Sequence, residues 1–307
     1  YSISYKKAWH ARTKTIRMVF GDWDGSYMVL PKFMHALQTS NPGTIVQWKH
    51  RYTGDTTNMP VFHFVFWSFK PVINGFRHCR PVITIDDTFL YKKYTGVLLV
   101  ATIVTANGKV LPLAFAVVDR ESLESWSFFI SNIKEHIVMD RQGVTLIFDR
   151  AESILAAVRR HWLNPLLLFV GYHRHCLRHV CSNFNTKFKN KELKQLLWKA
   201  RSAHQRRKCN GYLQQVQAID QEAINWVHKM SPVEWALSYD GGYRWGVLTN
   251  NDAECFNSVL KGARNLPISA MVEFTFRRLV KYFDEMGVQA EVDVRIEFQY
   301  PREMHKT

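Results

Sequence analysis

The pattern of hydrophobic positions changes character near residue 82. From that point, runs of Val, Ile, Leu and Phe flanked by turn residues predict five strands. Apolar residues at helical spacing predict one helix between the third and fourth strands and another after the fourth. The predicted strands cover 82–89, 96–104, 109–119, 144–149 and 167–172, and the predicted helices cover about 123–138 and 152–162.

The first 80 residues predict a mostly helical lead-in with small strands. Ser4 is placed to cap a helix that continues through 9–20, and Asp24-Gly25-Ser26 predicts a break. Helical spacing resumes over 27–37. Two short runs rich in strand-forming residues follow, and they predict a small sheet over 45–48 and 61–69.

After the fifth strand the sequence becomes charged, helical and poor in strand-type runs, which predicts an all-helical insertion. A later segment, 270–286, again has helical spacing, and the tail from Glu291 is expected to be a frayed end. We therefore expect five segments: a lead-in, two parts of an α/β core separated by the insertion, and a tail. Their boundaries are 1–80, 81–182, 183–242, 243–290 and 291–307.

The order of the core elements indicates a fold class. Three strands without intervening helices, followed by helices that alternate with strands, predict a mixed sheet of the α/β class. This is the element order of ribonuclease H-like folds, here with a helical insertion before the last part of the core. A fold class alone does not establish a function.

Acidic residues stand at positions where such a fold can bring them together. Asp86 and Asp149 end two hydrophobic strand-type runs, 83–86 and 145–149, and Glu254 follows at the head of a predicted helix. Read singly, they are a turn carboxylate, a helix N-cap and a first-turn glutamate. Read jointly, three carboxylates suit Mg²⁺ or Mn²⁺, and a pair of such ions cuts and joins phosphodiesters. We expect neighbouring carboxylates within about 4–8 Å and at least one raised pKa.

The net charge favours a polyanionic partner. The formal charge is +15, and basic clusters occur in several different segments. Many soluble proteins are basic without binding nucleic acid, but dispersed clusters are what contacts to a duplex backbone need. The candidate DNA contacts are Lys187, Lys189, Lys191, Arg206, Arg207 and Lys208.

Cysteine usage and hydropathy bound the environment. The five cysteines are odd in number and widely spread, as in a reduced intracellular protein. No apolar run approaches the roughly 18 residues of a membrane helix, so no membrane partner is expected. The sequence opens at Tyr1 rather than Met, so we expect an excerpt from which any targeting segment is missing.

A Cys-x-x-His element follows the fifth predicted strand. Cys176 and His179 could supply two zinc ligands, with His173 and His175 close by in the sequence. There is no obvious second ligand pair of the usual spacing. The favoured interpretation is a buried cysteine beside a hydrogen-bonded histidine that fixes the local structure, and zinc is the less favoured alternative.

Seven motifs in fixed order resemble the catalytic domain of plant Mutator-like (MULE) transposases. The likeness covers nearly the whole chain and is densest from about residue 81 to 275. Each motif is weak by itself, but their order and spacing are specific. They are DDTFLYKKYTG at 86–96, LPLAFAVVD at 111–119, SWSFF at 125–129, Asp149-Arg150, CLRH at 176–179, SNFNTKF at 182–188 and NDAECFN at 251–257.

The resemblance implies a ribonuclease H-like fold with DDE chemistry, in which two Mg²⁺ or Mn²⁺ ions act on DNA. It makes Asp86, Asp149 and Glu254 the catalytic, metal-binding triad, and it places Arg150 beside a metal ligand or a phosphate. The implied partners are duplex DNA, both transposon ends and target, and further copies of the chain. The implied location is the nucleus.

Some positions depart from the family pattern. Asp87 stands where glycine is usual, Phe148 where a small residue is common, and His175 replaces an aromatic residue. The flanking DNA-binding domain and Cys/His-rich zinc knuckle of a full transposase are not in the sequence. Excerpt, decayed copy and domesticated derivative therefore stay open, the last a non-catalytic nuclear DNA-binding or transcription-regulatory protein. Another ribonuclease H-like nuclease is a third alternative, against which the helical insertion and the Cys-x-x-His element speak.

Overall fold

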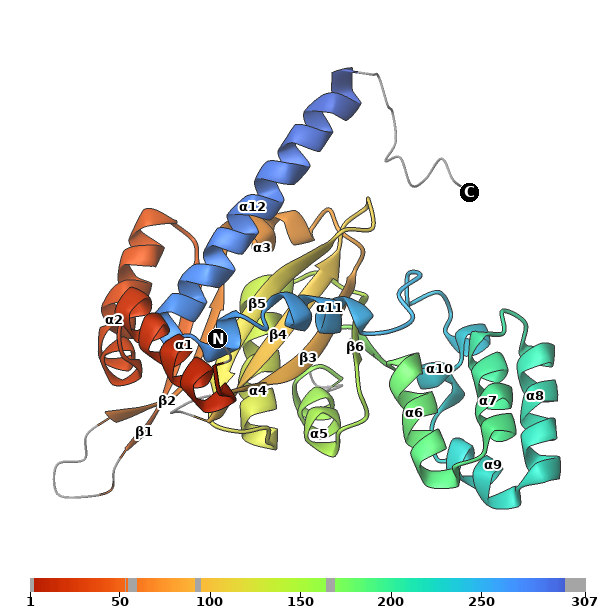
Figure 1. Ribbon diagram of the computed structural model, residues 1–307. Coiled ribbons are helices and arrows are strands. Elements are labelled where there is room, and N and C mark those ends of the chain that lie inside the picture. Colours follow the sequence, from red (N-terminus) through yellow and green to blue (C-terminus); the bar gives the residue numbers. More distant parts are fainter. Residues whose placement is uncertain (1–2, 53, 55–59, 92–94, 164–168, 296–307) are drawn as a thin grey trace.

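The computed structural model describes residues 3–52, 54, 60–91, 95–163 and 169–295. Its centre is a seven-stranded sheet in the order β1-β2-β5-β4-β3-β6-β7, with helices on both faces (Figure 1). The strands are β1 Ile45–Tyr52, β2 Pro60–Ser68, β3 Val82–Leu90, β4 Gly96–Val104, β5 Val110–Val118, β6 Val144–Phe148 and β7 Gly171–His175.

The pairing makes this a mixed sheet, which confirms the predicted α/β class. Strands β3, β4 and β5 pair antiparallel, and β6 and β7 then run parallel to β3. Most interior residues of β3 to β6 are buried, because helices cover both faces of the sheet. Such strands have continuous apolar runs instead of alternating polar and apolar residues.

The predicted bounds of the fifth strand were wrong. The apolar run at 167–172 suggested them, but the strand is Gly171–His175, and 164–168 lie outside the described residues. Strand β7 has few apolar side chains because its polar ones have buried partners. Arg174 binds Asp240, and His173 and His175 face Glu234.

The two N-terminal strands form no small sheet of their own, contrary to expectation. Strand β2 pairs antiparallel with β5, with Val65 opposite Val117, so β1 and β2 lengthen the central sheet. The predicted break at 24–26 was also wrong. Asp22 caps helix α2 there, because its Oδ1 accepts from the backbone N of Asp24 and of Gly25 at 2.9 Å.

Neighbouring residues of β2 show how the two faces are covered. The Phe66 ring lies 5.9 Å from Phe129 of α4 on one face. The Trp67 indole donates to Thr275 Oγ1 of α12 at 3.1 Å on the other. The helices outside the insertion are α1 Tyr5–Phe20, α2 Trp23–Ser40, α3 Lys70–Phe76, α4 Leu123–Ile133 with the π-helical turn η1 Lys134–Val138, α5 Glu152–His161, α11 Asn251–Val259, η3 Ala263–Asn265 and α12 Ile268–Arg295.

A helical subdomain follows β7 and has a core of its own. Its buried side chains include Phe184, Leu197, Val216, Ile224 and Trp235. Figure 1 shows its helices gathered beside the sheet, away from β1 and β2. Its elements are α6 Leu177–Phe188, α7 Lys191–Ser202, α8 Arg206–Ile219, α9 Gln221–His228, α10 Pro232–Trp235 and η2 Leu237–Tyr239.

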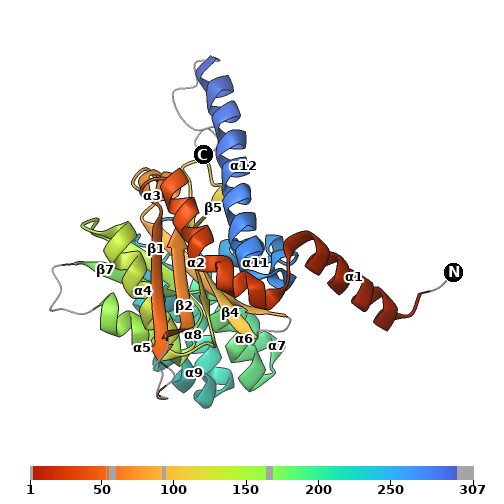
Figure 2. The ribbon, with the colours of Figure 1, turned by 90° about the vertical axis from the view of Figure 1, so that its left-hand side faces the viewer.

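Two helices project from the body. Helix α1 extends to one side in Figure 2, and α12 rises from the sheet in Figure 1. Helix α12 is longer than the predicted 270–286 and stays helical to Arg295, past the start of the expected frayed tail; 296–307 lie outside the described residues. Within the described chain, no helix combines the length and apolarity that crossing a membrane needs.

Candidate active site

The candidate site lies where β6 ends beside the middle of β3. The expectation that Asp86 ends its strand is wrong, because β3 continues to Leu90, whereas Asp149 directly follows β6. Because β3 and β6 are parallel neighbours, with Thr84 opposite Ile147, Asp86 and Asp149 lie level with each other on adjacent strands. Glu254 lies on α11, which packs against β3, β4 and β5.

Two asparagines hold the Asp86 carboxylate. Asn257 Nδ2 donates to Oδ2 at 2.8 Å, and Asn250 Nδ2 approaches Oδ1 at 3.4 Å. Burial, and then the charges of Asp87 and Glu254, raise the pKa of Asp86 to about 7. The expectation that at least one clustered carboxylate has a raised pKa is confirmed.

Asp87 belongs to the same acidic cluster. Burial, and then the charges of Glu121 and Asp149, raise the pKa of Asp87 to about 6. Successive residues of a strand face opposite ways, so Asp86 and Asp87 have different neighbours. The sequence showed Asp87 only as a departure from glycine, and its place in the cluster was missed.

Glu254 is held by two side chains of α6. It forms an ion pair with Arg178, and its Oε1 lies 3.5 Å from His179 Nε2. The interaction with Cys176 raises the pKa of His179 against the effect of burial, and the charges of Glu254 and Asp149 raise it further. His179 also acts on Asp86, so all three candidate carboxylates lie within electrostatic reach of one imidazole.

The donor set around Asp86 fits a hard divalent cation. Three oxygens near this carboxylate are buried without a hydrogen-bond partner: Asn250 Oδ1, Glu254 Oε1 and Asn257 Oδ1. Carboxylate and amide oxygens are the ligands that Mg²⁺ and Mn²⁺ prefer. The two asparagines were missed from the sequence, although both flank Glu254 in the segment that drew attention to it.

The three carboxylates do not form one tight group. Within the described residues, the only three His, Cys, Asp or Glu side chains with ligand atoms mutually within 4.8 Å are those of His173, His175 and Glu234. Asp86 and Glu254 are instead engaged by amide and cationic groups, as described above. The assignment of the triad stays a prediction.

Cys176 is buried and joins the start of α6 to the start of α11. Its Sγ accepts from the backbone N of Asn250 at 3.4 Å. Burial favours the neutral thiol, but the interaction with His179 and the backbone donors outweigh it and lower the pKa of Cys176. These contacts agree with the structural interpretation of the Cys-x-x-His element, whose role stays a prediction.

The predicted DNA contacts separate into two kinds. The six clustered residues on α6 to α8 are exposed: Lys187, Lys189, Lys191, Arg206, Arg207 and Lys208. Arg150 is half-buried, and its guanidinium lies 4.7 Å from the centre of the Trp226 ring. Arg150 therefore bridges the sheet edge and the helical subdomain.

These features define an α/β protein with an acidic site between the middle of β3 and the end of the parallel strand β6. Residues 82–183 match the family model of the MULE transposase domain. The matched segment contains Asp86, Asp149, Cys176 and His179, whereas Glu254 lies outside it. The search of curated proteins found no match.

Proposed function

We propose that this chain is the catalytic domain of a DDE-type DNA transposase with a ribonuclease H-like fold. The strand order supports the fold: three antiparallel strands, β5, β4 and β3, are followed by β6 and β7 parallel to β3. The observation that carries the proposal is the cluster around Asp86. It combines a raised carboxyl pKa at Asp86, inside the segment that matches the MULE transposase domain, with unpartnered oxygens that α11 and its N-cap bring to it from outside that segment.

Asp86, Asp149 and Glu254 would hold the divalent ions, Mg²⁺ or Mn²⁺. Bound there, the ions would supply an activated water or DNA 3′-hydroxyl and stabilise the leaving oxygen of a cut strand. Asn257 and Asn250 orient the Asp86 carboxylate through their amide groups. Arg178 and His179 position Glu254.

The substrate in this proposal is duplex DNA, both transposon ends and target. The exposed lysines and arginines of α6 to α8 would contact phosphates, and the half-buried Arg150 would do so nearest the acidic site. Joining two ends at one target favours a homo-oligomer assembled on the DNA. A DNA substrate also favours the nucleus as the place of action, and the resemblance favours a plant source.

The deciding experiment measures strand cleavage and joining. Wild type, Asp86→Asn and Glu254→Gln, each with flanking DNA-binding modules restored, are incubated with terminal-repeat duplex and Mg²⁺ or Mn²⁺. We expect cleavage by wild type, loss of roughly 100-fold or more in both variants, and no change in Glu285→Gln, an exposed carboxylate on α12.

Two results would overturn the proposal. Absence of cleavage by wild type, with DNA binding retained, would favour a domesticated regulatory protein. Full activity of Glu254→Gln would exclude Glu254 as a ligand. A parallel melting experiment should show that Mn²⁺ stabilises wild type and not Asp86→Asn, because the ion binds only the folded arrangement.

A further inference from the structure

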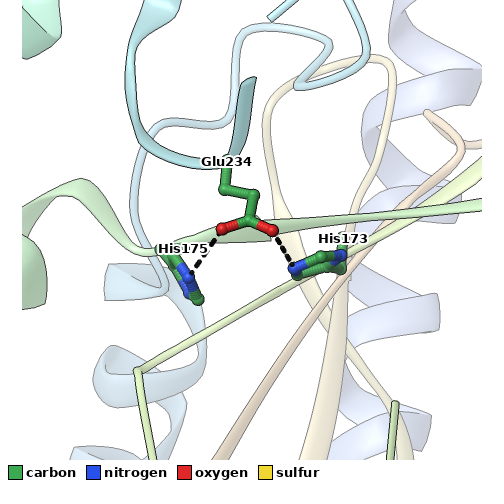
Figure 3. A group of neighbouring side chains, drawn as sticks. All are labelled: His173, His175 and Glu234. Carbon is green, nitrogen blue, oxygen red and sulfur yellow. Dashed lines mark ion pairs between the residues drawn. The ribbon is translucent and has the colours of Figure 1, made fainter. Parts of the chain in front are cut away.

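Strand β7 and helix α10 bring two histidines and a glutamate together outside the acidic cluster (Figure 3). His173 and His175 are two residues apart on one strand, so they share a face. Both flank the Phe148 ring, at 5.9 and 6.0 Å between ring centres. Glu234 comes from α10 of the helical subdomain, far along the chain.

The glutamate offers one oxygen to each histidine. His173 Nε2 lies 3.1 Å from Glu234 Oε1, and His175 Nε2 lies 3.4 Å from Oε2. Ligand atoms of a tetrahedral zinc ion at about 2.0–2.1 Å are roughly 3.3 Å apart. The two nitrogen–oxygen separations are close to that spacing, and one ligand atom of each of the three residues lies within 4.8 Å of the other two.

Burial also suits a borderline cation. The exposed fractions of the His173, His175 and Glu234 side chains are 13%, 3% and 26%. Neutral imidazoles are the commonest metal ligands in proteins, and here two of them lie largely shielded from water.

Hydrogen bonding alone does not account for the group. His173 Nε2 is buried and has no hydrogen bond of acceptable geometry, although the carboxylate oxygen is 3.1 Å away. Ring nitrogens and a carboxylate that converge on one point, with one nitrogen lacking a well-aligned hydrogen bond, are also what the ligands of one ion look like.

We propose that His173, His175 and Glu234 bind Zn²⁺ and thereby clamp the helical subdomain to the central sheet. Two histidines and one carboxylate are a known zinc ligand set, with a water molecule as fourth ligand. The site is separate from the oxygen-rich cluster around Asp86, whose ligands suit Mg²⁺ or Mn²⁺. The clamp does not depend on DNA cleavage by the neighbouring site.

One neighbouring cation opposes the ion. The charge of Arg150 acts on both His175 and Glu234. Arg244 donates to the backbone oxygens of Glu234 and His175, at 2.6 and 3.0 Å, and so fixes the main chain that carries two of the ligands. Removing the Arg150 charge should therefore tighten zinc binding.

The test measures zinc binding to protein freed of metal by a chelator. Competition with a chromophoric chelator gives affinity and stoichiometry, and Co²⁺ in place of Zn²⁺ reports tetrahedral coordination by its visible absorption. We expect one ion per chain. His173→Gln and Glu234→Gln should weaken binding roughly 100-fold, and Arg150→Gln should tighten it several-fold.

Matched controls locate the ion. His63→Gln alters a buried histidine that faces a single carboxylate, Asp119 at 3.5 Å, and should leave zinc binding unchanged. Asp86→Asn should also leave it unchanged, which separates this site from the proposed active site. Circular dichroism shows whether each variant is folded.

Two findings would overturn the clamp. Absence of stoichiometric zinc binding at micromolar concentration would make the group a metal-free ion-pair bridge. Unaltered binding in both folded ligand variants would place the ion elsewhere. A further expectation is that Zn²⁺ raises the melting temperature of wild type and not of Glu234→Gln.

Discussion

Asp86 combines partial burial with two anionic neighbours, Asp87 and Glu254. Water would normally solvate such a charge, but here two amide groups replace it. A site that holds carboxylates together in this way is costly without a cation, because the charged form is both desolvated and repelled. The ionised Asp86 carboxylate should therefore lower the stability of the metal-free protein, while the same charge favours metal binding.

The first prediction concerns the pH dependence of folding without metal. The folded pKa of Asp86 is about 7, whereas an unfolded aspartate has a pKa of about 3.9. Between these values the folded state retains the proton that the unfolded state has lost. Stability should therefore fall as pH rises from about 4 to 7, by a few kcal/mol at most.

Asp86→Asn should remove much of this fall and make the metal-free protein more stable at pH 8. Urea unfolding of both proteins at pH 5 and pH 8, with a chelator present, measures the difference. Asp284→Asn, an exposed change on α12, is the control and should have no effect. Equal stabilities of wild type and Asp86→Asn at pH 8 would contradict the prediction.

At the scale of elements, the turn after η2 is fixed to β7 by buried charges. Asp240 Oδ1 accepts from Arg174 Nε at 2.6 Å, and its Oδ2 accepts from the backbone N of Arg244 at 2.8 Å. Burial lowers the pKa of Arg244 to about 10. One carboxylate thus balances two buried guanidinium groups and joins the helical subdomain to the sheet.

The second prediction follows from this ratio of one buried carboxylate to two buried guanidinium groups. Asp240→Asn should destabilise the fold by about 3–5 kcal/mol, because it leaves buried positive charge without a partner. Glu273→Gln, which breaks the exposed pair with Arg277 on α12, should cost less than about 1 kcal/mol. Chemical denaturation of both variants gives the comparison, and similar costs for the two would be the contrary result.

Elements differ in how well the sequence predicts them, and β3 and β7 show why. The first half of β3 is buried on both faces, so a run of Val and Ile marks it and the aspartate that follows the run in the middle of the strand. Strand β7 keeps Arg174, His173 and His175 because distant residues, Asp240 and Glu234, neutralise them. The local pattern of apolar residues does not reveal such distant partners. The predicted bounds were therefore shifted toward the apolar residues that precede β7.

The same limit applies to the candidate site. Asp86 and Asp149 could be proposed because carboxylates that directly follow apolar runs stand out, and Glu254 because it heads a predicted helix within one of the family motifs. Asn250 and Asn257 could not, since their relation to Asp86 exists only once α11 lies against β3. The ion pair between Arg178 and Glu254 could not be predicted either, because the two residues are far apart in the sequence and meet only in the folded chain.

On the scale of the whole molecule, the helical subdomain presents one of several groups of positive charge, on α6 to α8. The chain carries a net charge of +15, and the clustered lysines and arginines of these helices are exposed. Phosphate neutralisation releases counterions, so binding driven by these residues must weaken steeply with salt. Basic residues that already have acidic partners, such as Arg277 and Lys281 on α12, should contribute less.

The third prediction uses this contrast. The triple change Arg206→Gln, Arg207→Gln and Lys208→Gln should weaken duplex binding and reduce the slope of log affinity against log salt by up to about 2.7. Fluorescence anisotropy with a labelled duplex between about 50 and 200 mM salt measures the slope. Arg277→Gln with Lys281→Gln is the control. An unchanged slope in the triple variant would remove α8 from the DNA surface.

The attachment of β1 and β2 to β5 bears on whether the segment that matches the family model could fold by itself. The stretch that carries the family likeness, 82–183, holds β3 to β7 but omits the strands that cover the outer edge of β5 and the helix that bears Glu254. Expressed alone, this segment would have the nine-residue apolar strand β5 as an unpaired edge strand, which favours aggregation with other chains. The matched segment is thus only part of a unit whose common hydrophobic core extends from α2 to α12.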